Sequence, residues 1–429
     1  MIDFSATLVP ENGLVSARAV RPPRRPAEPL WQGLAELHRS RTGAPEQQDA
    51  ALSPTVVGAY GISPSDTLTR AAGEAVERFA LYPVPGEGRV ARLEQLGDEA
   101  LDPTAAGVRL ADPAGTGRTL RWYPAQRLDH GTPLHVPAGL VDYPARPEDA
   151  EGFDPSPSGA ASGGSREAAL RSGLLEVIER DAFLTAWFHR LPLRRLDPDR
   201  FLADAPRPAP PSLQRFRQAL EAARAIGLSP VLARVPTHVP GVVCTVGIVI
   251  DHEGGQSLAA VGASASDDPG TSAVKALQEA LQIRSALRLV QETAPTADPS
   301  RRPRTDLERA QYFASAVGVR AVQRWMDSFV PLGDAEAETP GTTTVQALVE
   351  ALRRQDVDPV AVDLTHRLPD RIKAMGWCAV KVIPVGMQAL RMDDSLDFTW
   401  HHQRLSAARE RFGLGEDTIP ADPEPHPLI

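Results

Sequence analysis

The motif Glu-x-x-Glu-Arg occurs twice in this chain, at residues 74–78 and 176–180, and each copy follows a run that begins after a loop containing Gly and Ser. On a helix, residues three and four positions apart lie on one face, so each copy predicts a stripe of two carboxylates and one guanidinium. Apolar residues occupy the opposite side of both helices, and that side is expected to pack into the protein. Two such stripes that face each other would bind a hard cation and the phosphates attached to it.

Either copy alone has a simpler explanation. Glu and Arg four residues apart form a favourable surface pair that stabilises a helix by a few tenths of a kcal/mol. A third segment favours a shared site, because residues 270–292 predict another helix after a loop of small residues, with Asp268 or Thr271 as its cap. The polar side of this helix carries Lys275, Gln278, Glu279 and Gln282. By itself, such a helix is more often an ordinary core helix with one solvated face.

Composition excludes several classes of protein. The chain has 429 residues, 42% of them hydrophobic, which is enough for one large core or two closely packed subdomains. Its net charge of −9 argues against a non-specific nucleic-acid binder. The two cysteines, Cys244 and Cys378, lie far apart in apolar runs, which predicts buried thiols and no disulfide framework or zinc site. No apolar run approaches the roughly 20 residues that span a membrane, so we expect a cytoplasmic protein without membrane association.

The hydrophobic pattern predicts helices and strands that alternate without a regular βαβ order. Residues 17–28 are expected to form a loop, and residues 242–250 a strand buried on both faces. The other predicted strands are 119–123, 134–138, 357–364 and 379–384. The predicted helices are 66–82, 165–189, 209–226, 270–292, 305–327 and 344–355. This arrangement predicts an α+β fold with mixed sheets.

The C-terminal residues read Pro-Glu-Pro-His-Pro-Leu-Ile, with Pro423, Pro425 and Pro427 at alternate positions. Proline restricts φ, so this tail is stiff and extended. Two interpretations follow. The tail is either a disordered terminus, as most chain ends are, or an arm that lies in a groove and brings the Ile429 carboxylate to a defined place.

Taken together and in this order, the motifs resemble the YcaO family, ATP-dependent enzymes that modify the peptide backbone and are best known as cyclodehydratases in natural-product biosynthesis. The matching stretches are residues 12–16, 61–80, 158–163, 176–182, 276–282, 363–365, Asp370, 380–384 and the proline tail. The resemblance implies a YcaO-like α+β fold with an ATP and Mg²⁺ site between the acidic helices. It also implies an opening segment (1–50), a catalytic domain (51–419) and a C-terminal tail (420–429) that enters or orders the active site.

The resemblance assigns roles to individual residues. Mg²⁺ would be held by Glu74, Glu77, Glu176 and Glu179. ATP would be bound with the help of Arg78, Ser162, Arg180, Gln278, Glu279 and Gln282. Support of catalysis by the tail would fall to Pro423, Pro425, Pro427 and Ile429.

The implied reaction converts Cys, Ser or Thr of a ribosomally made precursor peptide to thiazoline or oxazoline. The side chain attacks the preceding carbonyl, ATP phosphorylates the oxyanion, and loss of phosphate leaves the ring. The sequence shows no ubiquitin-activating-like domain, so a separate leader-peptide-binding partner of that type is expected. A homodimer is favoured on frequency alone.

Two positions depart from the family pattern. Active members often carry Lys where this chain has Tyr60, in a turn expected to face phosphate, and Ser where it has Arg70. These departures keep two alternatives open. One is a related family activity that forms a thioamide or a macrolactamidine. The other is a degenerate scaffold that binds a peptide or partner without turning over ATP.

Overall fold

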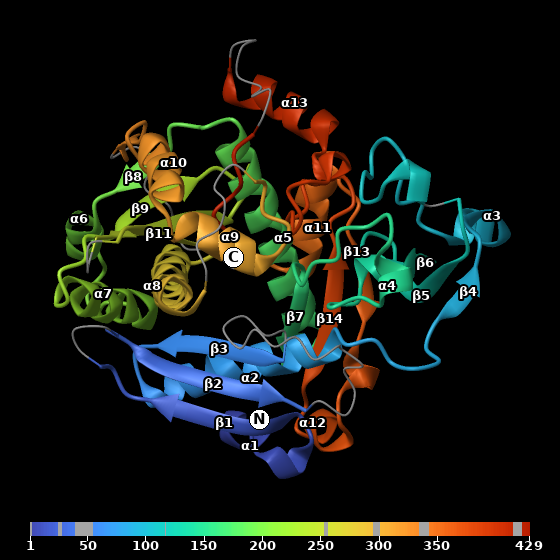
Figure 1. Cartoon of the computed structure of the whole chain (residues 1–429), viewed down its shortest axis with the longest axis horizontal. Coiled ribbons are helices and arrows are strands. Elements are labelled where there is room, and N and C mark those ends of the chain that lie inside the picture. Colours follow the sequence, from blue (N-terminus) through green and yellow to red (C-terminus); the bar gives the residue numbers. More distant parts are fainter. Residues whose placement is uncertain are drawn as a thin grey trace.

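The computed structural model describes residues 2–24, 28–38, 55–115, 117–252, 256–294, 301–333, 343–414 and 423–429. Over these residues the protein has an α+β fold whose strands form three sheets with helices packed between and around them (Figure 1). The predicted fold class is confirmed. Within the described ranges, none of the helices combines the length and the apolar character needed to cross a membrane.

The N-terminal sheet is antiparallel and contains, in spatial order, β1 (Val15–Arg21), β2 (Trp31–Leu37) and β3 (Val56–Gly61). Helix α2 (Pro64–Ala80) packs on β2 and β3 and carries the first motif (Figure 1). The prediction of a loop from residue 17 is wrong at its start, because β1 continues to Arg21. The cause is non-local, since β1 pairs with β2, for example Ala19 with Leu34. The predicted boundary at residue 50 lies outside the described residues, although β2 before it pairs with β3 after it.

The second sheet has the order β11-β10-β9-β8-β12. Its strands are β8 (Arg194–Leu196), β9 (Val231–Val235), β10 (Val243–Asp251), β11 (Leu258–Ser266) and β12 (Val330–Pro331). Nearly every residue of β10 is buried, as predicted. Helix α8 (Pro269–Thr293) packs along β10 and β11, where Gly247 and Gly262 are paired across the strands. A Cβ at Gly262 would lie 2.5 Å from the Ala280 nitrogen of α8, so these glycines allow the helix to approach the sheet closely.

The third sheet is antiparallel, has the order β4-β5-β13-β14-β7, and adds β6 beside β5. Its strands are β4 (Arg89–Ala91), β5 (Leu120–Arg127), β6 (Pro133–Pro137), β7 (Ala160–Gly163), β13 (Val360–Asp363) and β14 (Cys378–Ile383). Helix α5 (Arg166–Phe188) packs on β7 and β14 and carries the second motif. Cys244 is buried as predicted, whereas Cys378 at the start of β14 is only partly buried.

The helix predicted over 305–327 is two helices, α9 (Asp306–Phe313) and α10 (Ala316–Met326). Ser315 separates them, because its hydroxyl accepts from the backbone nitrogens of Val317 and Gly318 and begins a new helix. The remaining helices are α1 (Phe4–Thr7), α3 (Leu93–Leu96), α4 (Pro147–Ala150), α6 (Pro198–Ala203), α7 (Pro211–Arg224), α11 (Val345–Arg353), α12 (Asp370–Ala374) and α13 (His402–Phe412).

Two large hydrophobic clusters hold these layers together. One joins α5, α8 and the second sheet, and the other joins α2, the N-terminal sheet and part of the third sheet. Helix α2 also contacts β7, and α8 contacts β3. The polar sides of α2, α5 and α8 therefore meet between the two clusters.

Candidate active site

Side-chain caps fix where the three site helices begin. Ser63 accepts from the Asp66 nitrogen at 3.1 Å before α2, and Ser165 accepts from the Ala168 nitrogen before α5. Asp268, one of the two caps predicted for α8, accepts from the Thr271 nitrogen at 2.7 Å. Such caps satisfy backbone groups that a helix start leaves free. The start points in turn set which face of each helix carries its acidic residues.

The two motifs face each other as predicted, and together with Glu279 of α8 they form what we call the carboxylate cluster: Glu74, Glu77, Glu176, Glu179 and Glu279. Burial raises the pKa of Glu77 well above its usual value, and the charges of Glu74 and Glu176 raise it further. Residues from α2 and α5 thus act on the same carboxyl group. Their mutual repulsion is unfavourable unless a cation is present.

Two arginines lie among these carboxylates. Arg78 Nε donates to Glu74 Oε1 at 2.8 Å. Arg180 lies 3.8 Å from Glu176, 3.4 Å from Glu179 and 3.9 Å from Glu279. Burial still raises the pKa of Glu179 to about 8, with Arg180 opposing the rise. The guanidiniums therefore offset only part of the cost of burying these carboxylates.

Lys381 on β14 is a site residue that the sequence analysis did not identify. Its side chain is buried and donates to the carbonyl oxygens of Ser156 at 2.6 Å and Ser158 at 2.5 Å. Burial lowers its pKa to about 8, while Glu176 and Glu77 act in the opposite direction. A lone lysine in the apolar strand 378–383 was the available signal. Its partners, however, lie more than two hundred residues earlier in the chain.

The residues predicted to assist ATP binding join the site helices to their surroundings. Ser162 Oγ donates to the Gly73 carbonyl oxygen at 2.9 Å, linking β7 to α2. Gln282 Nε2 donates to the Gly58 carbonyl oxygen at 3.2 Å, linking α8 to β3. Glu279 Oε2 accepts from the Ala263 nitrogen at 2.9 Å. These contacts hold α2 and α8 in place beside the carboxylate cluster.

The two departures from the family pattern have defined positions. Tyr60 lies on β3 rather than in a turn, and its hydroxyl interacts with Ser285 and Glu28. Arg70 donates to Gln278 Oε1, and Gln278 Nε2 in turn donates to Asp66 at 3.0 Å. Burial lowers the pKa of Arg70. Arg70 thus bridges α2 and α8 beside the cluster, whereas Tyr60 is engaged elsewhere.

The donor set fits Mg²⁺ and phosphate. Among the described residues, no three or more acidic, His or Cys side chains are arranged as a metal site, and Arg78 and Arg180 pair with carboxylates of the cluster. Carboxylate oxygens are nevertheless the ligands that Mg²⁺ prefers, and guanidiniums bind phosphate. Arg180 Nε is buried without a hydrogen-bond partner in the described part of the chain, although it lies 3.8 Å from Glu176 Oε1.

The tail residues 423–429 pack against the protein, which is the second of the two interpretations above. The Glu424 carbonyl oxygen accepts from Trp187 Nε1 at 3.1 Å, and the Glu424 carboxylate pairs with Arg190 and Arg324. His426 is buried, and its ring interacts with the Arg391 carbonyl oxygen at 2.6 Å. Pro427 is buried, whereas Pro423, Pro425 and Ile429 are partly buried. The C-terminus lies near the centre of the molecule, by α5 and α9 (Figure 1).

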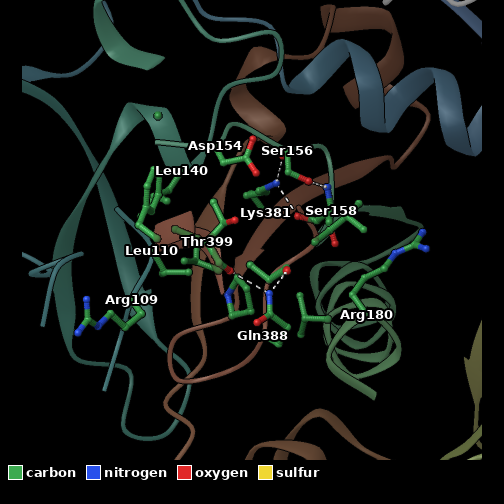
Figure 2. A pocket seen from close by; sticks show the side chains of 17 residues that line it. Arg109, Leu110, Leu140, Asp154, Ser156, Ser158, Arg180, Lys381, Gln388 and Thr399 are labelled. Atoms are coloured by element: carbon green, nitrogen blue, oxygen red, sulfur yellow. Dashed lines mark hydrogen bonds between the residues drawn. The ribbon is translucent and has the colours of Figure 1, made fainter. Parts of the chain in front are cut away.

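A partly open cavity of about 60 Å³ lies beside the carboxylate cluster. Arg180 and Lys381 form part of its wall, and Leu110 and Leu140 lie across it from Arg180 (Figure 2). The 384–399 loop contributes Gln388, Leu390, Phe398 and Thr399. The sequence analysis did not predict this cavity, because its lining comes from segments far apart in the chain.

Curated relatives match part of this chain. An uncharacterized protein in the tfuA 3′ region of Rhizobium leguminosarum bv. trifolii is 32% identical over 149 residues, and an uncharacterized protein of Methanothermobacter thermautotrophicus is 34% identical over 146 residues. These matches cover 33% and 32% of this chain and 35% and 36% of the relatives. The chain therefore spans about a third of the length of the curated relatives it matches.

Solved structures share the fold. A heterocyclase in complex with substrate and cofactor has a TM-score of 0.71 at 18% identity and covers 99% of this chain and 56% of that chain. YcaO from Methanopyrus kandleri, bound with AMPPCP and Mg²⁺, has a TM-score of 0.60 at 20% identity and covers 88% of this chain and 87% of that chain. The E. coli microcin synthetase McbBCD complex has a TM-score of 0.59 at 14% identity, with 86% and 87% covered. At these identities the likeness concerns the fold.

The model of one protein family, described as YcaO cyclodehydratase, ATP- and Mg²⁺-binding, matches residues 58–388. This range contains both Glu-x-x-Glu-Arg motifs and α8. The family description confirms, at the level of the family, the expectation of ATP and Mg²⁺ as cofactors. The match extends over more than half of the residues, and the chain belongs to the YcaO family.

Proposed function

We propose that this chain is an ATP-dependent cyclodehydratase that converts Cys, Ser or Thr of a ribosomally made precursor peptide to thiazoline or oxazoline. The observation that carries the proposal is the carboxylate cluster, in which burial raises the pKa of Glu77, Glu176, Glu179 and Glu279. Such a cluster is costly to the folded protein without a cation, and strongly shifted groups concentrate at functional sites. Structural neighbours described as a heterocyclase and a microcin synthetase support the same chemistry.

In this proposal Glu74, Glu77, Glu176 and Glu179 hold Mg²⁺, and Arg78 and Arg180 bind the phosphates. ATP supplies the phosphoryl group that converts a poor leaving group, the amide oxygen, into a good one. The chain's own contribution is to position the reactants and to stabilise charge. Ser162, Gln278, Glu279 and Gln282 assist ATP binding, and their contacts hold α2 and α8 beside the site. Arg70 takes over contact with phosphate from the lysine that other members carry at the position of Tyr60.

The tail has a positioning role in this proposal. Arg309 donates to the carbonyl oxygens of His426 at 3.0 Å, Arg391 at 3.2 Å and Met392 at 3.0 Å. One buried guanidinium thus joins the tail to the 384–399 loop, which lines the cavity beside the cluster. Because Pro423, Pro425 and Pro427 stiffen the tail, little conformational entropy is lost when it docks. In the proposal, docking of the tail also brings the Ile429 carboxylate to a fixed place, where it supports the active site.

The substrate in this proposal is a precursor peptide, delivered by a separate leader-peptide-binding partner of the ubiquitin-activating-like type. The division into an opening segment (1–50), a catalytic domain (51–419) and the tail (420–429) belongs to the same proposal, as does a homodimer. Neighbours named as a complex with substrate and as the multi-protein McbBCD complex support a peptide substrate and partner proteins.

The first test is the thermal stability of the protein with and without Mg-ATP. A ligand at about a hundred times its Kd stabilises a protein by about 2.7 kcal/mol, which raises Tm by a few degrees in a chain of this size. We expect a Mg²⁺-dependent rise in the parent and none in the double variant Glu176→Gln/Glu179→Gln. The matched control, Glu167→Gln/Glu221→Gln, changes two exposed glutamates and should respond like the parent. No response of the parent to millimolar Mg-ATP would contradict the proposal and favour the scaffold alternative.

Product mass distinguishes azoline from thioamide formation, whereas macrolactamidine formation also loses one water. With Mg-ATP and a pool of short peptides containing Cys, Ser or Thr, azoline formation makes the product lighter by one water. Formation of a thioamide would instead replace oxygen by sulfur and make the product heavier. A product of the second kind, formed in the presence of sulfide, would overturn the azoline assignment.

A further inference from the structure

We propose that the cavity beside the carboxylate cluster is a specificity pocket that accepts a small or medium aliphatic side chain of the peptide substrate, next to the amide that reacts. This inference rests on the proposed function, because that function places the reacting amide at the cluster. It adds what the function leaves open, namely which neighbouring side chains the enzyme accepts.

The cavity shares wall residues with the carboxylate cluster. Arg180 belongs to its wall and also lies within 3.4 Å of Glu179. Lys381, a second wall residue, interacts electrostatically with Glu176 and Glu77. Val177, on the apolar side of α5, lines the cavity as well. A side chain in this cavity would therefore belong to a peptide residue that lies next to the carboxylate cluster.

Three polar side chains in the cavity wall already form hydrogen bonds within the protein (Figure 2). Lys381 donates to two backbone carbonyl oxygens. Asp154 accepts from the Met392 nitrogen at 2.8 Å, and Gln388 donates to the Thr399 carbonyl oxygen at 3.0 Å. These groups are already engaged within the protein. The surface left for an occupant is mainly apolar, and its apolar part includes Leu110, Leu140, Val177, Ile383, Leu390 and Phe398.

The volume of the cavity limits the size of the side chain that it can hold. One water-sized group needs roughly 10–15 Å³ of such space, so a cavity of about 60 Å³ holds roughly four to six of them. The side chains of Val, Leu and Ile contain three or four carbon atoms and fit this space, whereas an indole does not. The expected occupant is therefore aliphatic and no larger than Leu or Ile.

The cavity also has a well-supported wall. Asp154 accepts from the backbone nitrogens of Met392 and Asp393, and Arg309 donates to the Arg391 and Met392 carbonyl oxygens. The 384–399 loop is thus held at residues 391–393 by two side chains, Asp154 and Arg309, and Arg309 also binds the tail. A wall fixed in this way gives the cavity a definite shape, which discrimination between side chains requires.

The test uses N-acetyl amino acid N-methylamides of Gly, Ala, Val, Leu and Trp as probes, titrated by methyl NMR with and without Mg-AMPPCP. Burial of one methylene is worth roughly a fourfold change in Kd. We expect affinity to rise by about that factor per carbon from Gly to Leu, and the Trp probe to bind no better than the Gly probe. Equal binding of the Gly and Leu probes by the parent would overturn the inference.

Two variants of Leu140, a half-buried wall residue, make the result specific to the cavity. Leu140→Trp fills the space and should abolish the preference for Leu over Gly, whereas Leu289→Trp, at a side chain 43% exposed, should leave it unchanged. Leu140→Ala enlarges the space and should allow the Trp probe to bind, a gain that an unfolded protein cannot show. A Leu preference that survives Leu140→Trp would refute the pocket.

The two proposals fail in different ways. A parent that shows no response to Mg-AMPPCP contradicts the proposed function, while the titrations without nucleotide still report on the cavity. A parent that binds Mg-AMPPCP but ranks the probes without regard to their side chains retains the proposed function and loses the specificity pocket.

Discussion

Replacement of Glu179 by Gln should make the protein more stable at alkaline pH while it removes nucleotide binding. Glu179 has 9% of its side chain exposed, accepts from the Ala265 nitrogen at 2.9 Å and lies 3.4 Å from Arg180. The amide oxygen of Gln can keep the bond to Ala265. What the substitution removes is a buried negative charge beside Glu176 and Glu279.

The magnitude follows from the pKa. Burial, the largest cause, raises the pKa of Glu179 from 4.5 to about 8. At about 1.36 kcal/mol per pKa unit, ionisation of this group in the folded protein costs about 5 kcal/mol. Between pH 4.5 and 8 the folded state holds a proton that the unfolded chain has released, so the parent loses stability as pH rises through this window. The stability of the Gln variant does not fall in this way, because Gln carries no titrating proton.

Urea denaturation in EDTA at two pH values checks this reasoning. The free energy of unfolding of Glu179→Gln should exceed that of the parent by about 1 kcal/mol at pH 5.5 and by about 5 kcal/mol at pH 8.5. Mg-ATP should stabilise the parent and not the variant. A variant less stable than the parent at pH 8.5, or a difference that does not change with pH, would mean that Glu179 is an ionised structural partner of Arg180.

Three further substitutions test other contacts. Arg70→Ala should weaken Mg-AMPPCP binding about tenfold in calorimetry, because one charged contact with phosphate is lost. The control Arg217→Ala, at an exposed site, should leave the affinity unchanged. Equal affinities of the parent and Arg70→Ala would show that Arg70 does not replace the missing lysine. His426→Ala should lower stability by about 1–3 kcal/mol in urea and shift Trp emission towards that of a solvent-exposed side chain, because the buried Arg391 carbonyl oxygen keeps Arg309 but loses its bond to the His426 ring; an unchanged emission spectrum would contradict a docked tail. Gly262→Ala should cost about 1–3 kcal/mol through overpacking against α8, while Gly107→Ala, which has open space around its Cβ, should be neutral; similar costs would refute the close approach.

Local patterns predicted the three site helices well, whereas α13 and several short helices were not predicted. Helix α5 begins after its cap at Ser165 and ends at Phe188, within one residue of the predicted bounds. The break at Ser315 was also readable locally, since Ser is a favourable cap, but the apolar pattern continues through it. The extension of β1 to Arg21 had no local signal. Strand pairing depends on a partner segment elsewhere in the chain, and residues 17–21 do not alternate strongly in hydrophobicity.

Some residues of the candidate site could likewise be predicted from the sequence, and others could not. The carboxylates and arginines of the two motifs could be predicted, because their spacing alone places them on one face of each helix. Lys381, Asp154 and His426 were missed. Each is a polar residue whose partners are backbone groups of distant segments, and no spacing rule connects them.

The sequence by itself therefore determined the family, the acidic faces of α2 and α5, and the stiffness of the tail, because each depends on residues close together in the chain. Only the tertiary structure decided that Arg180 lies among three carboxylates, that Lys381 borders the same cluster, and that the tail is joined through Arg309 to the loop lining the cavity. These contacts join residues far apart in sequence. Their free energies arise from burial and charge in the folded state, where distance in space rather than along the chain sets the interaction.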